Sequence, residues 1–148
     1  MATYGLAILG STGSIGVNTL KVVDYHSKRF RVIALSAYTN VVLLKQQIRK
    51  YKPLYVAAKA EFLNDLKLEF SSLKIKFFDV EREATHLASL KEVDTVILAM
   101  RGAGALAPFL EAARAGKRIA PANKEALVIA GDLIMKEALL HKAMIIPI

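Results

Sequence analysis

Three glycines recur at a spacing of three in "GSTGSIG", residues 10–16, directly after a short apolar run. Because glycine has no Cβ, the chain can turn tightly there and a ligand can approach the backbone closely. Between a strand and a helix, such a turn offers unpaired N–H groups and the positive end of the helix dipole to a pyrophosphate. Ser11, Thr12 and Ser14 add hydroxyl donors. The segment therefore predicts a dinucleotide-binding loop, and a plain tight turn is the alternative.

The glycine spacing also narrows the class of nucleotide. The segment lacks the Gly-Lys-Ser/Thr of a P-loop, so a mononucleotide triphosphatase is not expected.

A Cβ at Gly13 is expected to collide with the ligand or, if the turn needs a positive φ there, to strain the backbone.

The end of the second expected strand indicates which dinucleotide binds. In NAD-binding domains an acidic residue at this place accepts hydrogen bonds from the ribose 2′-hydroxyl, and it would repel a 2′-phosphate. The segment "SAYTN", residues 36–40, contains no acid, and its Thr39 and Asn40 can donate hydrogen bonds to a phosphate. The sequence therefore predicts NADP(H) rather than NAD(H).

A second polar motif, "PANKEALV" at residues 121–128, follows another short apolar run. At the carboxyl end of a sheet, Asn123, Lys124 and Glu125 would face the nicotinamide half of the cofactor and its substrate. Asn123 can orient an amide or a hydroxyl group, and Lys124 can hold an anionic or carbonyl oxygen. The alternative is that these are solvated residues in the first turn of a helix.

These motifs need a scaffold of alternating strands and helices, which the apolar pattern provides. We expect strands at 6–9, 31–36, 54–57, 74–78, 94–100, 118–120 and 143–148. We expect helices at 15–25, 41–51, 60–68, 81–90, from about 108 to 116, 124–129 and 132–141. This alternation predicts a single α/β domain over residues 1–148, with a doubly wound, mostly parallel, Rossmann-like sheet of six or seven strands. The glycine turn should lie at its carboxyl edge.

Composition restricts the partners. With 21 Lys and Arg against 13 Asp and Glu, the net charge is +8, which fits either an anionic small ligand or a solvated basic surface. The basic residues are scattered, so nucleic acid is not an expected partner. No apolar run is long enough to cross a bilayer, and the sequence has no Cys. We therefore expect a cytoplasmic protein without membrane contact.

Taken together, the motifs resemble the 1-deoxy-D-xylulose 5-phosphate reductoisomerase family over essentially the whole chain. The matching stretches are residues 8–16 with Thr19 and Leu20, residues 30–37 leading to Asn40, residues 122–128, and the closing "IIPI". The resemblance implies NADPH-dependent rearrangement and reduction of a phosphosugar, 1-deoxy-D-xylulose 5-phosphate, to 2-C-methyl-D-erythritol 4-phosphate. It also implies Mg or Mn as a cofactor and a homodimer for the full-length enzyme.

The resemblance also assigns cofactor roles to individual residues. Near the NADPH pyrophosphate and ribose it places Thr12, Gly13, Ser14 and Ile15. It places Asn40 near the 2′-phosphate, where the residues themselves also suggest Thr39, and it places Asn123 and Glu125 near the nicotinamide. Lys124 would contact the substrate. The sequence departs from the family pattern at Tyr38 and Thr39, where a glycine and a basic or small residue are common, and at Pro121. Arg101 also departs, and it is either a cation for the cofactor or a solvated side chain.

Length is the largest departure, because family members are more than twice as long. Their metal-binding Asp-Ser-Glu-His motif begins after the strand that ends here at Ile148. The resemblance thus implies that residues 1–148 are a cofactor domain without a catalytic residue or a metal ligand. Such a domain would bind NADPH but would not turn over the substrate. Two alternatives stay open: another NADP-dependent oxidoreductase, such as homoserine dehydrogenase, and a regulatory dinucleotide sensor.

Overall fold

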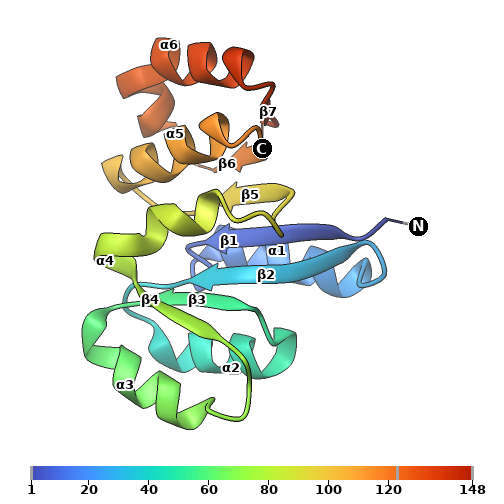
Figure 1. Ribbon diagram of the computed structural model, residues 1–148, viewed down its shortest axis with the longest axis vertical. Helices are drawn as coiled ribbons and strands as arrows, with labels where there is room; N and C mark the ends of the chain where they lie inside the picture. Colours follow the sequence, from blue (N-terminus) through green and yellow to red (C-terminus); the bar gives the residue numbers. More distant parts are fainter. Residues whose placement is uncertain (1, 123, 148) are drawn as a thin grey trace.

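The computed structural model describes residues 2–122 and 124–147, and over these ranges it contains one sheet of seven strands in the order β4-β3-β2-β1-β5-β6-β7 (Figure 1). Every neighbouring pair is parallel. The strands are β1 (Tyr4–Leu9), β2 (Phe30–Ser36), β3 (Tyr55–Ala58), β4 (Lys76–Asp79), β5 (Thr95–Leu98), β6 (Arg118–Pro121) and β7 (Met144–Ile145). Strand order reverses between β1 and β5, which makes their carboxyl ends the switch point where such sheets bind ligands. The predicted fold class is confirmed.

Helices cover both faces of this sheet. The described α-helices are α1 (Ser14–Tyr25), α2 (Val41–Tyr51), α3 (Ala60–Glu69), α4 (Val80–Glu83), α5 (Leu106–Arg114) and α6 (Glu125–Leu140). Two 3₁₀ turns, η1 (Ala84–Ala88) and η2 (Ala103–Ala105), complete the described helical elements. Buried residues of α1, α2 and α3 pack in one core cluster, and those of α4, η1, α5 and α6 pack in the other.

The central strand β1 shows why both layers are needed. Leu6 and Ile8 belong to the α1–α3 cluster, whereas Ala7 and Leu9 belong to the opposite one. All four side chains are at most 4% exposed. Since successive side chains of a strand point to opposite faces, a continuous apolar run is the pattern of a parallel strand that is covered on both sides.

The expectation of one polar helix over residues 81–90 is wrong. Helix α4 ends at Glu83, and a 3₁₀ turn follows whose Ala84 and Leu87 are buried against the sheet. The charged residues "ERE" at 81–83 make the whole segment look polar, although the residues after them include apolar ones that are buried. Side chains three residues apart share one side of a 3₁₀ turn, which suits Ala84 and Leu87.

The two helices expected at 124–129 and 132–141 form one element with a kink. Ala130 has non-helical φ −140° and ψ 31°, and it separates the two arms of α6.

Within the described ranges, no helix is both long enough and apolar enough to span a membrane.

Phe109 tests the packing of α5 on the sheet, because its side chain is fully buried. Phe109→Ala should lower the free energy of unfolding by about 3–5 kcal/mol, since it removes buried apolar contacts and leaves a cavity. Phe109→Leu should cost markedly less. Urea denaturation of the three proteins checks this, and equal stability of Phe109→Ala and the parent would contradict the core assignment.

Candidate functional site

The glycine loop leaves the carboxyl end of β1 and is fastened to the end of the neighbouring strand β2. The N–H groups of Gly10 and Ser11 donate to the carbonyl oxygen of Ser36, at 3.1 and 2.8 Å. Gly10 N–H also lies 3.1 Å from the Ser36 hydroxyl oxygen, which accepts from it. The loop therefore lies at the expected carboxyl edge, beside the switch point between β1 and β5.

Two of the three glycines are required by the fold. Gly10 has φ +90°, and a Cβ there would lie 2.7 Å from the Ala99 carbonyl oxygen. A Cβ on Gly16 would lie 2.6 Å from backbone atoms of Ser11 and closer still to the Gly10 carbonyl oxygen. These approaches seat the first turn of α1 on the loop, and any larger residue would force them apart.

Gly13 differs from both, because neither backbone conformation nor packing requires a glycine there. It caps α1 with φ −77° and ψ 174°, and it is exposed. A Cβ on Gly13 would meet only the Gly10 carbonyl oxygen, at an ordinary 3.7 Å. The positive φ considered for this residue is therefore wrong. Open space in front of the helix N-terminus is what glycine provides at this position.

Ser11 does not join the hydroxyl donors of the loop surface, contrary to the sequence-based expectation. It is fully buried, and its hydroxyl donates to Oε1 of Gln47 at 2.7 Å. The Gln47 amide in turn donates to the Ser11 carbonyl oxygen at 2.9 Å. Thr12 is half-buried and Ser14 is exposed. Sequence reasoning missed Gln47, whose signal was a polar residue on the apolar face of α2 beside Leu44 and Ile48.

Two cavities adjoin the loop along the carboxyl edge of the sheet. The larger, of about 610 Å³, reaches from the loop over the end of β2 to α4 and η1. Its lining includes Gly10, Thr12, Gly13, Tyr38, Thr39, Glu81, Thr85 and Pro108. The smaller, of about 420 Å³, is lined by Gly13, Ser14, Ile15, Ala99, Met100, Arg101, Ala122, Lys124 and Glu125. Gly13, Ala99, Met100 and Arg101 line both cavities, so the two lie on either side of the α1 N-terminus.

The structure brings most of the predicted site residues to these cavities. Thr39 lines the larger cavity with Thr12, and Lys124 and Glu125 line the smaller one with Ser14 and Ile15. Asn40 lines neither cavity; its side-chain oxygen accepts from Leu43 N–H at 3.1 Å and caps α2. Asn123 lies outside the described residues.

Arg101 is the residue whose role the sequence left open. It is exposed, follows β5 and lines both cavities beside Gly13. Arg101 thus adds a cationic side chain to cavities that adjoin the α1 N-terminus, and a helix N-terminus favours anions. Among residues 2–122 and 124–147, no group of three or more His, Asp or Glu side chains is arranged to hold a metal ion.

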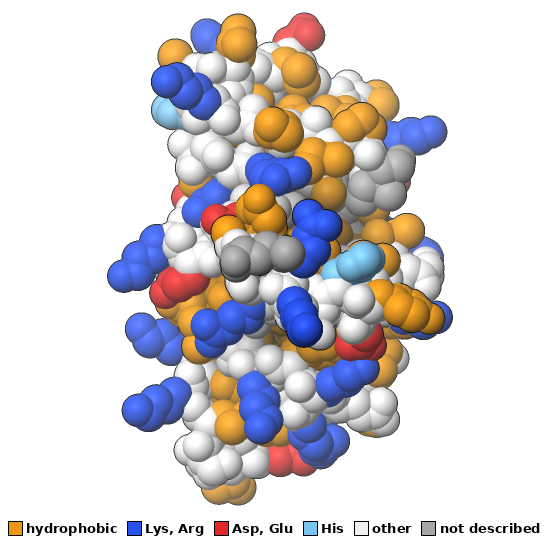
Figure 2. Space-filling view, turned by 90° about the vertical axis from the view of Figure 1, so that its right-hand side faces the viewer, with side chains coloured by type: hydrophobic (Ala, Val, Ile, Leu, Met, Phe, Trp, Pro, Cys, Tyr) orange, Lys and Arg blue, Asp and Glu red, His pale blue; other side chains and the backbone are white. Residues whose placement is uncertain are grey.

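Basic side chains also lie on the face of the molecule that is opposite these cavities. Figure 2 views the side on which the strands begin, opposite the glycine loop, and Lys and Arg side chains are spread over it with few acidic ones. The Lys and Arg side chains on this face contribute to the net charge of +8 as a basic surface, which is one of the two interpretations of the sequence.

Gly16 and Gly13 give a matched pair of stability tests. Gly16→Ala should lower the free energy of unfolding by at least about 2 kcal/mol, because its Cβ overlaps fixed backbone. Gly13→Ala should cost less than about 1 kcal/mol, the scale of a helix-cap substitution. Thermal and urea unfolding measure both. Equal losses would contradict the separate roles of the two glycines.

Gln47 and its exposed neighbour Gln46 give a second pair. Gln47→Leu should destabilise the fold by about 1–3 kcal/mol, because the buried Ser11 carbonyl loses its side-chain donor and the Ser11 hydroxyl keeps only the longer 3.3 Å contact to the Ser36 carbonyl oxygen. Gln46→Leu should change stability little. Urea denaturation compares them, and the idea fails if both variants unfold at the same urea concentration as the parent.

Comparison with known proteins identifies the family. A family model described as 1-deoxy-D-xylulose 5-phosphate reductoisomerase matches residues 6–131. A curated relative of that name from Methylococcus capsulatus (strain Bath) is 45% identical over 148 residues, which cover 97% of this chain and 38% of the relative. The chain thus spans well under half the length of such relatives.

Solved structures agree with this match. A DOX-P reductoisomerase in complex with NADPH, fosmidomycin and magnesium has a TM-score of 0.92 at 39% identity, covering 97% of this chain and 36% of that one. The Zymomonas mobilis enzyme in complex with NADPH has a TM-score of 0.91 at 30% identity, covering 99% and 39%.

The homoserine dehydrogenase alternative has weaker support. The enzyme from Thiobacillus denitrificans has a TM-score of 0.63 at 19% identity, covering 98% of this chain and 29% of that one, which is a likeness of fold alone. The reductoisomerase family model, by contrast, matches most of the chain. This chain therefore belongs to the 1-deoxy-D-xylulose 5-phosphate reductoisomerase family.

Proposed function

We propose that residues 1–148 form the NADPH-binding domain of a 1-deoxy-D-xylulose 5-phosphate reductoisomerase. The observation that carries the proposal is the exposed Gly13 at the N-terminus of α1, between two cavities that together flank the switch point of the sheet. The residues present fit a dinucleotide, because protein atoms leave the space in front of Gly13 open. A Cβ there would meet the Gly10 carbonyl oxygen at an ordinary 3.7 Å. When bound, NADPH supplies the hydride for the reduction.

The pyrophosphate is assigned to the first turn of α1. Backbone N–H groups at a helix start are unpaired, and they point along the positive end of the dipole. The first turn of α1 contains no acidic residue that would compete with a phosphate. Thr12, Ser14 and Ile15 surround this position, and Arg101 adds a cation beside it.

The two halves of the cofactor are assigned to the two cavities. The adenosine half fits the larger one, which includes Thr39 at the end of β2, with Asn40 next in the chain at the start of α2. The nicotinamide half fits the smaller one, where Glu125 would contact it and Lys124 would contact the substrate. Asn123, which precedes Lys124 in the sequence, is proposed to contact the nicotinamide as well. This assignment follows the general rule that the first strand–helix turn holds the phosphates between the two halves.

The activity itself is proposed for the complete protein. It would rearrange and reduce 1-deoxy-D-xylulose 5-phosphate to 2-C-methyl-D-erythritol 4-phosphate as a cytoplasmic homodimer. The complex of a DOX-P reductoisomerase with fosmidomycin and magnesium supports a phosphorylated substrate and a divalent metal for the family. Among the described residues, no group of three or more His, Asp or Glu side chains could hold such a metal.

Calorimetry of NADPH binding to the chain tests the assignment of the loop. Gly13→Ala should weaken NADPH binding by at least about tenfold, or 1.4 kcal/mol, because its Cβ takes the space of the pyrophosphate. Gly131→Ala is the matched control, since a Cβ there meets no atom within 4 Å. Undiminished binding by Gly13→Ala would overturn the loop assignment.

The choice of cofactor gives a separate measurement. NADPH should bind more tightly than NADH, because no acid at residues 36–40 repels the 2′-phosphate. The margin should shrink as salt rises, since ions screen the phosphate contact beyond about 10 Å at 0.1 M. Titrations of both cofactors at low and high salt check this, and equal affinities at low salt count against NADPH.

A further inference from the structure

The proposed 2′-phosphate site lacks a cation of its own. A 2′-phosphate lies at the end of the second strand of such a sheet, where NADP-binding domains commonly provide an arginine. Here the loop from Ala37 to Asn40 is uncharged. Its polar groups are hydroxyls and the Asn40 side chain, whose oxygen is already engaged in capping α2. Neutral donors alone give weaker phosphate contacts than charge-assisted ones.

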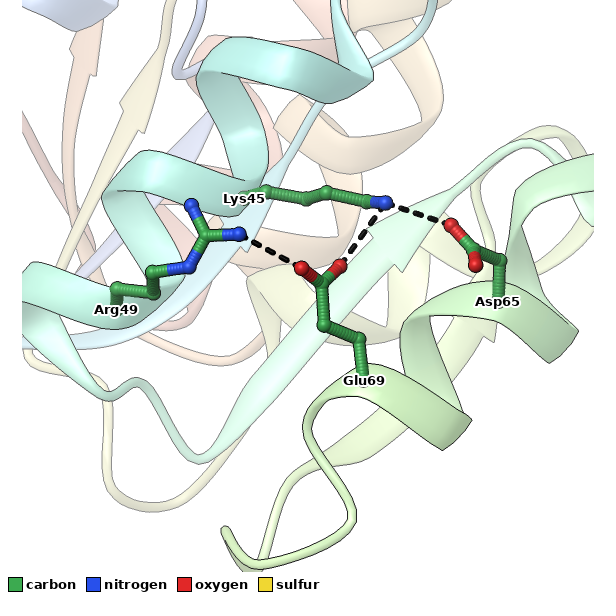
Figure 3. A network of polar contacts seen from close by, with 4 residues as sticks. All are labelled: Lys45, Arg49, Asp65 and Glu69. Carbon is green, nitrogen blue, oxygen red and sulfur yellow. Dashed lines mark hydrogen bonds and ion pairs between the residues drawn. The ribbon is translucent and has the colours of Figure 1, made fainter.

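The nearest cations along α2 are already paired with acids of α3 (Figure 3). Lys45 Nζ lies 2.6 Å from an Asp65 carboxylate oxygen and 2.9 Å from one of Glu69. Arg49 lies 2.7 Å from the other Glu69 oxygen. The hydrogen bonds to Asp65 and Glu69 raise the pKa of Lys45. These two cations are directed toward α3, away from the loop at the start of α2.

Lys59 reaches the loop from the adjacent strand. It directly follows β3 and is the N-cap residue of α3, where its side chain makes no capping bond. Ala37 N–H donates to the Ala57 carbonyl oxygen at 3.1 Å, which joins the start of the loop to the end of β3. Lys59 Nζ lies 5.6 Å from the centroid of the Tyr38 ring, and Tyr38 lines the larger cavity.

Lys59 is also available to a ligand. It is half-buried, and none of the ion pairs between described residues includes it. The acid at the end of the adjacent strand, Asp79 on β4, accepts from Glu81 N–H at 2.9 Å and lies 3.8 Å from Arg82. A ring face attracts an ammonium group without neutralising it, so Tyr38, which lines the cavity, can hold Lys59 with its charge intact.

We propose that Lys59 is the specificity-determining cation for the 2′-phosphate of NADPH, held over the Tyr38 ring at the end of the neighbouring strand. The inference rests on the proposed NADPH-binding function and names a residue that it does not include. The physical basis is that a cation on the neighbouring strand takes the place of the one missing after β2. Strands β2 and β3 are adjacent and parallel, so their carboxyl ends share one edge of the sheet. A cation after β3 can therefore serve a ligand bound at the end of β2.

The test compares Lys59→Gln with Lys28→Gln by calorimetry. Lys28 is exposed and precedes Arg29, whose carbonyl oxygen accepts from Tyr4 N–H at the opposite, amino edge of the sheet. The probes are NADPH, NADH and 2′,5′-ADP. Lys59→Gln should weaken NADPH and 2′,5′-ADP by about tenfold, the size of one charged hydrogen bond, and leave NADH within about twofold. Lys28→Gln should change none of them, and Lys59→Arg should keep the preference for NADPH.

The outcomes separate this inference from the proposed function. If the parent chain binds NADPH and Gly13→Ala weakens it, but Lys59→Gln retains full NADPH affinity, the role of Lys59 is overturned and the proposed function stands. If Lys59→Gln weakens NADPH and NADH equally, the residue does not read the 2′-phosphate, and the inference is likewise overturned. If the parent binds neither cofactor, the proposed function fails first. Melting temperatures of the unliganded variants report any loss of fold separately.

Discussion

The approach of the α1 N-terminus to the loop after β1 is the constraint on which the site depends. Gly10 and Gly16 allow backbone to lie against backbone at distances that no Cβ permits. The helix start is thereby fixed directly above the carboxyl end of the central strand. Hydrogen bonds from the loop to Ser36, and from Gln47 to Ser11, hold the same turn from the side. The helix dipole is therefore directed at one fixed point of the sheet edge.

Fixing the loop from beneath leaves its outer surface open. The inward side is occupied by Ser11, whose hydroxyl is satisfied within the protein. The outward side presents Gly13 and the first N–H groups of α1 between the two cavities. Because the strand order reverses at this point, the helices on either side diverge and leave room for an elongated ligand. A dinucleotide, with a charged centre and two flat ends, matches that shape.

Charge in this molecule is arranged locally rather than as one field. Lys45 and Arg49 join α2 to α3 through ion pairs with Asp65 and Glu69. Many other basic side chains lie on the face at the opposite edge of the sheet. Cations close to the proposed cofactor, such as Arg101 and Lys59, belong to loops after β5 and β3. Net charge is thus a poor guide to where a phosphate binds.

The sequence by itself determined the parallel sheet and the location of the loop, because these depend on local patterns. Continuous apolar runs predict strands covered on both faces, and the helix expected at 41–51 is α2 (Val41–Tyr51) as observed. Glycines between a strand and a helix predict a tight turn wherever they occur. Tertiary structure decided which glycine serves the fold and which leaves space, since the contacts of Gly10 involve Ala99, far along the chain. It also turned Ser11 inward onto Gln47 and brought Lys59 to Tyr38, pairs separated by 36 and 21 positions in the sequence. Such contacts arise only when parallel strands are placed side by side, and no local pattern of residues encodes them.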